Sequence, residues 1–123
     1  MSTPRILVVD DNHMNLELAR VLLTRDGMQV ATALDAETAL LLVAEFRPDL
    51  VLMDIQLPNI DGLELTRRLR ADSVNSGLVI IAFTAYAMKG DEARMLAGGC
   101  DGYLSKPVDV PRFAAQVRSF LKA

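Results

Sequence analysis

The sequence predicts an α/β fold: a five-stranded parallel sheet in the order 2-1-3-4-5, with helices on both faces. Three runs of consecutive apolar residues, at 6–9, 50–53 and 78–83, are long enough for strands and too short for ordinary helices. Strands that are apolar throughout are typical of a sheet that is buried on both faces. A helical segment follows each expected strand. This β–α alternation, repeated five times, indicates parallel strands joined by right-handed crossovers.

The first two β–α units have clear boundaries. Asp11 or Asn12 can cap the first helix, and Gly27 follows its end, where glycine is common. The second strand mixes polar and apolar residues and suits a sheet edge. Asp35 caps the second helix, and Pro48 prevents its continuation. We expect strands at 5–9 and 28–33, and helices at 13–26 and 37–46.

The last three units follow the same pattern. A polar loop over 73–77 precedes the fourth strand, Gly98 and Gly99 stop the fourth helix, and Pro107 follows the fifth strand. We expect strands at 49–53, 78–83 and 102–105, and helices at 62–72 and 89–97. The final helix shows an apolar stripe at helical spacing, which predicts core packing for Val110, Phe113, Ala114, Val117 and Leu121.

Composition excludes several classes of protein. A chain of 123 residues, 51% apolar and 24% charged, forms one domain with a substantial core and is not disordered. The 13 basic residues are scattered and the net charge is −3, so direct nucleic-acid binding is not expected. The single cysteine, Cys100, excludes an internal disulfide and fits a reducing compartment. Since no signal peptide or membrane-spanning apolar run is found, we expect a cytoplasmic protein without membrane insertion.

Chemically reactive side chains stand at the carboxyl ends of four expected strands. Asp10 and Asp11 follow the first strand, and Asp54 follows the third. Thr84 closes the fourth strand, and Lys106 follows the fifth. In a parallel sheet these ends lie at one edge, and open α/β sheets bind ligands there, where the strand order reverses. With the first and third strands adjacent, three carboxylates, a hydroxyl and an ammonium are expected to share one crevice.

The charges in this crevice indicate a hard metal ion. Three carboxylates and one ammonium leave a net charge of −2, and closely packed like charges do not all stay ionised without compensation. Oxygen ligands with room for water favour Mg²⁺ beside phosphate oxygens, so phosphoryl transfer is the favoured reaction. Asp54, from the central strand, is the best nucleophile, and Lys106 and Thr84 can contact the transferred group. The alternative reading makes Asp54 a turn residue, Thr84 a strand residue and Lys106 a surface residue.

Four segments that span nearly the whole chain carry a family resemblance. They are ILVVDDN (6–12), LVLMDIQLPNIDGLELTRRLR (50–70), IIAFTAYAMKGDEA (80–93) and GGCDGYLSKPV (98–108). In combination they resemble the receiver domains of bacterial two-component signalling, the CheY-like family. The second and third are especially similar to single-domain regulators of the DivK type and to receivers attached to hybrid histidine kinases. The resemblance implies one receiver domain over 1–123, and part of the expected strand order is carried over from it.

The resemblance implies that Asp54 is the phosphoacceptor. The phosphoryl group would come from a phosphohistidine of a histidine kinase or histidine phosphotransfer protein. Asp11 and Asp54 would ligate Mg²⁺ directly, Asp10 mostly through water, and Gln56 through its backbone carbonyl. The protein would then be a signalling switch and not an enzyme, apart from limited self-phosphorylation and self-dephosphorylation.

The resemblance also implies a conformational switch. Thr84 and Lys106 would contact the phosphoryl group. Tyr103 matches the family's aromatic switch residue, which turns inward as Thr84 moves toward the phosphate. The peptide bond between Lys106 and Pro107 is expected to be cis, as is typical of the family. Phosphorylation would change contacts with a downstream effector protein through the fourth and fifth helices and the last strand.

Other readings stay open. The chain is either a natural single-domain regulator, which the initiator-like Met1 favours, or a receiver excised from a hybrid histidine kinase or another multidomain regulator. A Mg²⁺-dependent aspartyl-phosphate phosphohydrolase would use the same nucleophile, but such enzymes usually carry a second Asp where this chain has Gln56. A flavodoxin-like cofactor binder shares the topology, but Asp10 and Asp11 would repel a flavin phosphate.

Overall fold

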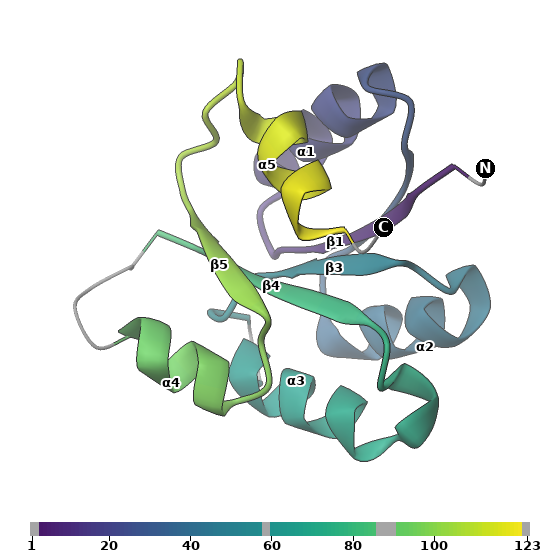
Figure 1. Ribbon diagram of the computed structural model, residues 1–123, viewed down its shortest axis with the longest axis vertical. Helices are drawn as coiled ribbons and strands as arrows, with labels where there is room; N and C mark the ends of the chain where they lie inside the picture. The colour runs from purple at the N-terminus through teal and green to yellow at the C-terminus, as the bar shows by residue number, and fades with distance from the viewer. Residues whose placement is uncertain (1–2, 58–59, 86–90, 122–123) are drawn as a thin grey trace.

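The computed structural model describes residues 3–57, 60–85 and 91–121, and it has the expected α/β architecture (Figure 1). Neighbouring strands are parallel, and their order is β2-β1-β3-β4-β5. Within the described ranges the strands are β1 (Arg5–Val9), β2 (Gln29–Ala33), β3 (Leu50–Met53), β4 (Val79–Thr84) and β5 (Gly102–Ser105). The helices are α1 (His13–Arg25), α2 (Ala36–Phe46), α3 (Gly62–Ala71), α4 (Asp91–Ala97) and α5 (Phe113–Phe120), with the 3₁₀ helix η1 (Ser73–Asn75).

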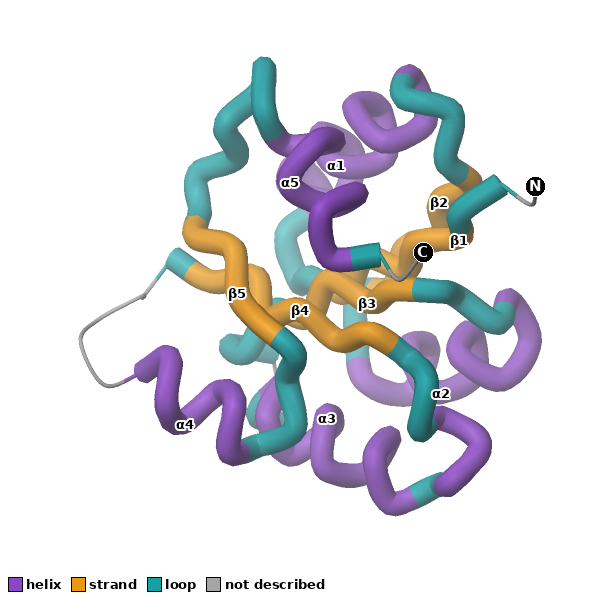
Figure 2. Tube along the Cα trace, viewed as in Figure 1, coloured by secondary structure: helices purple, strands orange, loops and turns teal. Residues whose placement is uncertain are grey.

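The sheet is buried on both faces, as its apolar strands predict. Helices α1 and α5 cover one face, and α2, α3 and α4 cover the other (Figures 1 and 2). The side chains of β3 alternate between the two apolar layers. Leu50 and Leu52 pack with the side chains of α1 and α5, whereas Val51 and Met53 pack with those of α2 and α3. The all-apolar sequence of β3 is therefore explained by two hydrophobic layers that meet at one strand.

The apolar stripe predicted for the last helix is wrong at Val110. Helix α5 begins only at Phe113, so Val110 lies outside it, and its side chain is 53% exposed. Val110 precedes Pro111, and the proline ring disfavours a helical conformation of the residue before it. The Asp109 carbonyl instead accepts hydrogen bonds from the N–H groups of Arg112 and Phe113 in the turn that leads into α5.

The structure differs little from the other predicted elements. The loop expected at 73–77 contains η1, whose first turn is capped by the Asp72 carboxylate. The expected start of the fourth helix at Lys89 lies outside the described residues, and α4 is described from Asp91. β2 is half-exposed at the sheet edge, as its mixed sequence predicts. Among the described residues, no helix is both long and apolar enough to cross a membrane.

Asn12, not Asp11, caps α1. The Asn12 side-chain oxygen accepts hydrogen bonds from the backbone N–H groups of Met14 at 2.8 Å and Asn15 at 3.2 Å. This satisfies two of the donors that a helix start leaves unpaired. Because Asn12 performs this role, the exposed carboxylate of Asp11 is not used as the cap and remains at the carboxyl edge of the sheet.

Arg70 joins the end of α3 to two distant segments. Its side chain is only 22% exposed, and its guanidinium donates hydrogen bonds on three sides. The acceptors belong to the loop before β4 and to the turn between α4 and β5. They are the carbonyls of Gly99 (3.0 Å), Asn75 (3.0 Å) and Leu78 (2.6 Å) and the carboxylate of Asp101 (2.7 Å).

We expect Arg70→Met to lower the free energy of unfolding by about 2–3 kcal/mol, because hydrogen bonds to a charged group are lost and backbone acceptors are left unpaired. Arg67→Met is the matched control on the same helix. The Arg67 side chain is 58% exposed, and within the described part of the chain its ion-pair partner is Glu64 alone, so a loss of about 0.5 kcal/mol or less is expected. Urea denaturation of both variants measures the difference. Equal losses would show that the Arg70 contacts do not stabilise the fold.

Candidate functional site

Three carboxylates meet at the carboxyl ends of β1 and β3. Val9 and Met53 are paired in register, so the residues after them, Asp10 and Asp54, leave the sheet side by side. The Asp54 N–H also donates to the Val9 carbonyl at 2.9 Å, which extends the pairing by one residue. Asp10, Asp11 and Asp54 each offer a carboxylate oxygen, and these oxygens lie within 4.8 Å of one another. The predicted convergence of the three acids is thus present in the structure.

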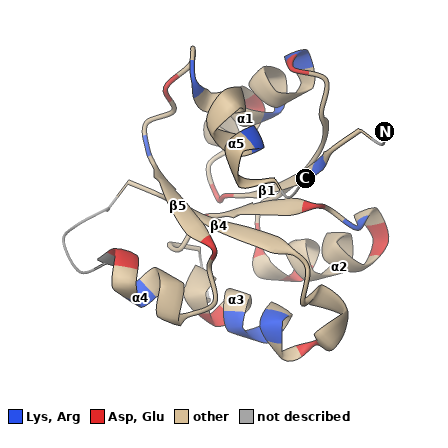
Figure 3. Ribbon diagram, in the orientation of Figure 1, with Lys and Arg blue, Asp and Glu red and all other residues tan. Residues whose placement is uncertain are grey.

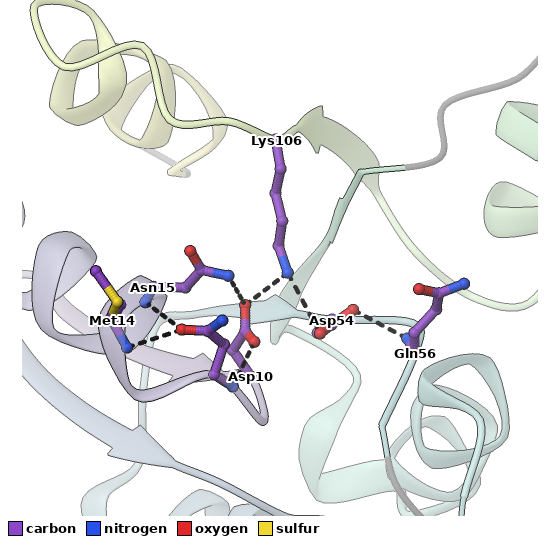
Figure 4. Close-up of polar contacts among 7 residues, drawn as sticks. Asp10, Met14, Asn15, Asp54, Gln56 and Lys106 are labelled. Carbon is purple, nitrogen blue, oxygen red and sulfur yellow. Dashed lines mark hydrogen bonds and ion pairs between the residues drawn. The ribbon is translucent and has the colours of Figure 1, made fainter.

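Lys106 brings the ammonium to the same place (Figure 4). The backbone N–H of Lys106, the residue after β5, donates to the backbone carbonyl of Thr84, the last residue of β4, at 2.8 Å. Its Nζ lies 2.6 Å from Oδ2 of Asp10 and 3.3 Å from Oδ2 of Asp54. The side chain is only 14% exposed, so the alternative of a surface lysine is wrong. The bond between Lys106 and Pro107 is cis, as the resemblance implies.

Gly62 holds the backbone of Asp54 in place from the start of α3. Its N–H donates to the Ile55 carbonyl at 3.0 Å. A Cβ at this position would lie 2.2 Å from the Asp54 carbonyl oxygen and 2.6 Å from the Ile55 Cα, far inside van der Waals contact. Only glycine allows this close approach of helix and strand end. The Gln56 N–H then donates to Oδ1 of Asp54 at 2.9 Å and orients the carboxylate.

Burial raises the pKa of Asp54 above its ordinary value. The hydrogen bond from the Gln56 N–H and the charge of Lys106 lower it, and the neighbouring Asp10 raises it further. The net direction is upward, because the effect of burial outweighs the hydrogen bond from Gln56 and the charge of Lys106. Burial, with a smaller contribution from the charge of Asp10, therefore disfavours the ionised form of Asp54.

Thr84 lies on β4, which is next to β3, and Tyr103 lies on β5, the edge strand beside β4. Thr84 is buried at the end of β4 and pairs in register with Ser105. Tyr103 is half-buried on β5 and packs against the apolar layer formed with α2, α3 and α4. The Gln56 side chain is exposed, and only its backbone contacts Asp54 in the interactions described above. Both residues that the sequence predicts for the switch thus lie on the two strands whose carboxyl ends meet at Thr84 and Lys106.

The sequence did not point to Asn15, which also contacts the cluster. Its side-chain Nδ2 lies 3.3 Å from Oδ2 of Asp10, and the Asn12 N–H donates to Oδ1 of Asp10 at 2.9 Å (Figure 4). A neutral amide adds nothing to a charge pattern. The usable signal is its spacing: Asn15 follows the helix cap by three residues, and so it lies on the first turn of α1, beside the end of β1.

The donor set fits Mg²⁺. Hard divalent cations prefer carboxylate, carbonyl and water oxygens, and Mg²⁺ typically uses one or two carboxylates and keeps several waters. The clustered oxygens of Asp10, Asp11 and Asp54 offer these ligands. The other described acidic and basic residues are distributed over helices, strand ends and loops (Figure 3).

Residues 6–118 match the family model of the response regulator receiver domain. The chain belongs to this family. It is similar to the polar-differentiation response regulators DivK of Brucella anthropi, with 46% identity over 116 residues and 94% of each chain covered, and of Brucella ovis, with 44% identity over 119 residues and 97% covered. This receiver domain is accordingly a component of two-component signalling, and its family acts as a signalling switch.

Solved structures agree with this assignment. A CheY-like receiver domain protein from Methanospirillum hungatei has a TM-score of 0.85 and 30% identity, with 96% of this chain and 93% of that chain covered. The chemotaxis response regulator CheY4 of Vibrio cholerae has a TM-score of 0.91 at 24% identity, covering 98% of this chain and 100% of that one, and shows the shared fold.

Asp54→Asn is expected to stabilise the metal-free receiver domain at neutral pH. The pKa of Asp54 is higher in the folded than in the unfolded chain, so unfolding releases a proton at pH values between the two. Wild-type stability therefore falls as pH rises through this interval and then levels off. The variant lacks this loss and leaves Lys106 paired with Asp10 alone. Urea denaturation in EDTA at several pH values measures the difference, which should be small in acid and grow toward neutral pH. A less stable variant at neutral pH would contradict the prediction.

Gly62→Ala is expected to distort the loop that carries Asp54, because the added methyl group overlaps backbone atoms that cannot move aside. A backbone clash of this kind costs more than the 1–3 kcal/mol typical of overpacking a core with side-chain atoms. Gly77→Ala is the control, since a Cβ there meets nothing within 4 Å. The stability measured by urea denaturation and the Mg²⁺ affinity measured by calorimetry should both be lower in Gly62→Ala. Both should be unchanged in Gly77→Ala. Normal Mg²⁺ binding by Gly62→Ala would overturn the role given to this contact.

Proposed function

We propose that this receiver domain accepts a phosphoryl group on Asp54 from the phosphohistidine of a histidine kinase or histidine phosphotransfer protein. The observation that carries the proposal is the position of the Lys106 ammonium between Asp10 and Asp54, whose carboxylates cluster with that of Asp11. Such an arrangement suits a site that receives an anionic group next to a divalent cation. The chemistry of the receiver would be limited to its own phosphorylation and dephosphorylation.

The proposed phosphoryl transfer is a nucleophilic displacement at phosphorus. An oxygen of the ionised Asp54 carboxylate attacks phosphorus, the P–N bond of the phosphohistidine breaks, and the imidazole leaves with the electron pair. The Gln56 N–H and Lys106 favour the ionised carboxylate against the effect of burial. Lys106 and Thr84 would then contact the oxygens of the phosphoryl group. Mg²⁺, when bound, supplies neutralising charge.

The residues that would hold Mg²⁺ are those that the resemblance implies: Asp11 and Asp54 directly, Asp10 mostly through water, and Gln56 through its carbonyl. The donor chemistry of the cluster supports the three acids. For the switch, we propose movement of Thr84 and Tyr103 on the adjacent strands β4 and β5. Tyr103 is only half-buried, so its ring can be reached from the surface before it turns inward.

The signal would leave the domain through protein contacts with a downstream effector. The proposal assigns residues 1–123 to one receiver domain, and it applies equally to a free-standing regulator and to a receiver within a larger protein. A cytoplasmic location, expected from the single cysteine, fits access to a kinase and an effector.

The exposed apolar residues of α1 form the surface that we assign to the phosphodonor protein. Met14, Leu18 and Val21 are exposed at helical spacing, and Met14 is 80% exposed although it lies one turn from the acidic cluster. A donor must bring its phosphohistidine to Asp54 and so must cover the surface around this edge of the sheet. Exposed apolar residues beside the site give that contact a hydrophobic component.

Incubation with acetyl phosphate and Mg²⁺ is expected to add one phosphoryl group, detected by intact mass. Asp54→Asn should add none, and omission of Mg²⁺ should abolish the reaction. Lys106→Met should react about a hundredfold more slowly or worse, because a charge-stabilising donor is lost. Steady turnover of a generic phosphate ester would instead support the phosphohydrolase. Phosphorylation of Asp54→Asn to the wild-type level would overturn the assignment of the acceptor.

Leu18→Lys is expected to slow phosphotransfer from a phosphohistidine protein that phosphorylates the wild type, by about tenfold or more, which corresponds to about 1.4 kcal/mol of lost binding. Its reaction with acetyl phosphate should be unchanged, because the small donor needs no protein surface. Leu41→Lys on α2, on the opposite face of the sheet, is the exposed control. Equal rates for both lysine variants with the protein donor would exclude α1 as the docking surface.

A further inference from the structure

Asp10 is the most deeply buried charged group of the site, and both of its oxygens have donors. The residue is 0% exposed. Its Oδ1 accepts the Asn12 N–H at 2.9 Å. Its Oδ2 accepts two groups, the Lys106 ammonium at 2.6 Å and the Asn15 amide at 3.3 Å (Figure 4). One oxygen of this carboxylate is therefore shared between a strong charged donor and a weaker neutral one.

The charged donor has a second task. Under the proposed function, on which this inference rests, Lys106 binds the phosphoryl group on Asp54. The ammonium now lies nearer to Asp10 than to Asp54, at 2.6 Å against 3.3 Å. A phosphoryl group carries about −1.5 to −2 charges and three acceptor oxygens, and these attract Lys106 toward Asp54. Its contact with Asp10 then weakens or breaks.

The loss of its strongest donor is unfavourable for a carboxylate that is 0% exposed, because bulk solvent does not reach it to replace the lost hydrogen bond. The Asn15 amide is the donor that remains beside Oδ2 when Lys106 moves away, while the Asn12 N–H remains on Oδ1. Asn15 lies on the first turn of α1, and its own backbone N–H is held by the cap residue Asn12 at 3.2 Å. Its position is therefore set by the helix and does not depend on Lys106.

We propose that Asn15 is a positioning residue for phosphorylation: its amide keeps the buried Asp10 carboxylate hydrogen-bonded and in place while Lys106 moves to the phosphoryl group. A neutral amide suits this task better than a charged side chain. A carboxylate at position 15 would add to the net charge of −2 from three acids and one lysine. An ammonium would neutralise the acids that are to hold the metal ion.

The test compares how tightly matched variants bind beryllofluoride. This compound activates the DrrB receiver domain. Asn15→Leu removes the amide with little change in volume. Asn75→Leu is the matched control, because the Asn75 amide also makes one hydrogen bond, to the Leu69 carbonyl at 3.0 Å, and belongs to η1 before β4. Beryllofluoride is titrated into each protein at saturating Mg²⁺ and followed by amide NMR, and urea denaturation without ligands gives the stability of each variant.

We expect the half-saturating concentration of beryllofluoride to rise about tenfold or more in Asn15→Leu, as for the loss of one hydrogen bond to a charged group. Asn75→Leu should lose stability and bind as the wild type does. Asn15→Gln, which keeps an amide donor, should bind more tightly than Asn15→Leu. Wild-type binding by Asn15→Leu would overturn the inference, as would equal weakening in Asn15→Leu and Asn15→Gln. Failure of the proposed function is distinct: the wild type itself would then bind no beryllofluoride and accept no phosphoryl group.

Discussion

The ammonium of Lys106, placed between two buried carboxylates, is the interaction on which the site depends. One ammonium pairs with both Asp10 and Asp54, so the site has more negative than positive charge. Backbone N–H groups provide part of the compensation, from Asn12 to Asp10 and from Gln56 to Asp54. The remaining deficit has a use, because it favours the arrival of a divalent cation. A site with equal numbers of acids and bases would have no such preference.

The same arrangement sets stability against reactivity at Asp54. Burial raises its pKa and so disfavours the ionised carboxylate, which is the nucleophilic form. Lys106 and the Gln56 N–H act in the opposite direction and keep that form accessible. The carboxylate is thus partly removed from water without being neutralised by a tight ion pair. Receiver domains are signalling switches. A switch requires a reactive group, here the Asp54 carboxylate, that is not held in its most stable form.

The strands and the acidic cluster could be predicted from the sequence because parallel pairing converts a linear pattern into contacts. Once β1 and β3 are neighbours in register, Asp10 and Asp54 must emerge together. Features that depend on one local competition could not be predicted. Asp and Asn are equally good residue types for a helix N-cap, so only the structure shows that Asn12 and not Asp11 is used. At Val110 the helical spacing continues across a proline, and the local effect of the proline decides the outcome.

Helix α3 is fixed at both ends, and this closes a ring of contacts through the molecule. At its start, Gly62 lies against the Asp54 carbonyl. About 12 Å further along the helix, at a rise of about 1.5 Å per residue, the Arg70 guanidinium donates a hydrogen bond to Asp101 just before β5. Strand β5 then runs back to Lys106, whose ammonium returns to Asp54. Two continuous sets of contacts therefore connect the Asp54 backbone with Lys106: a short one through the ion pair, and a long one through helix α3, the Arg70 guanidinium and strand β5.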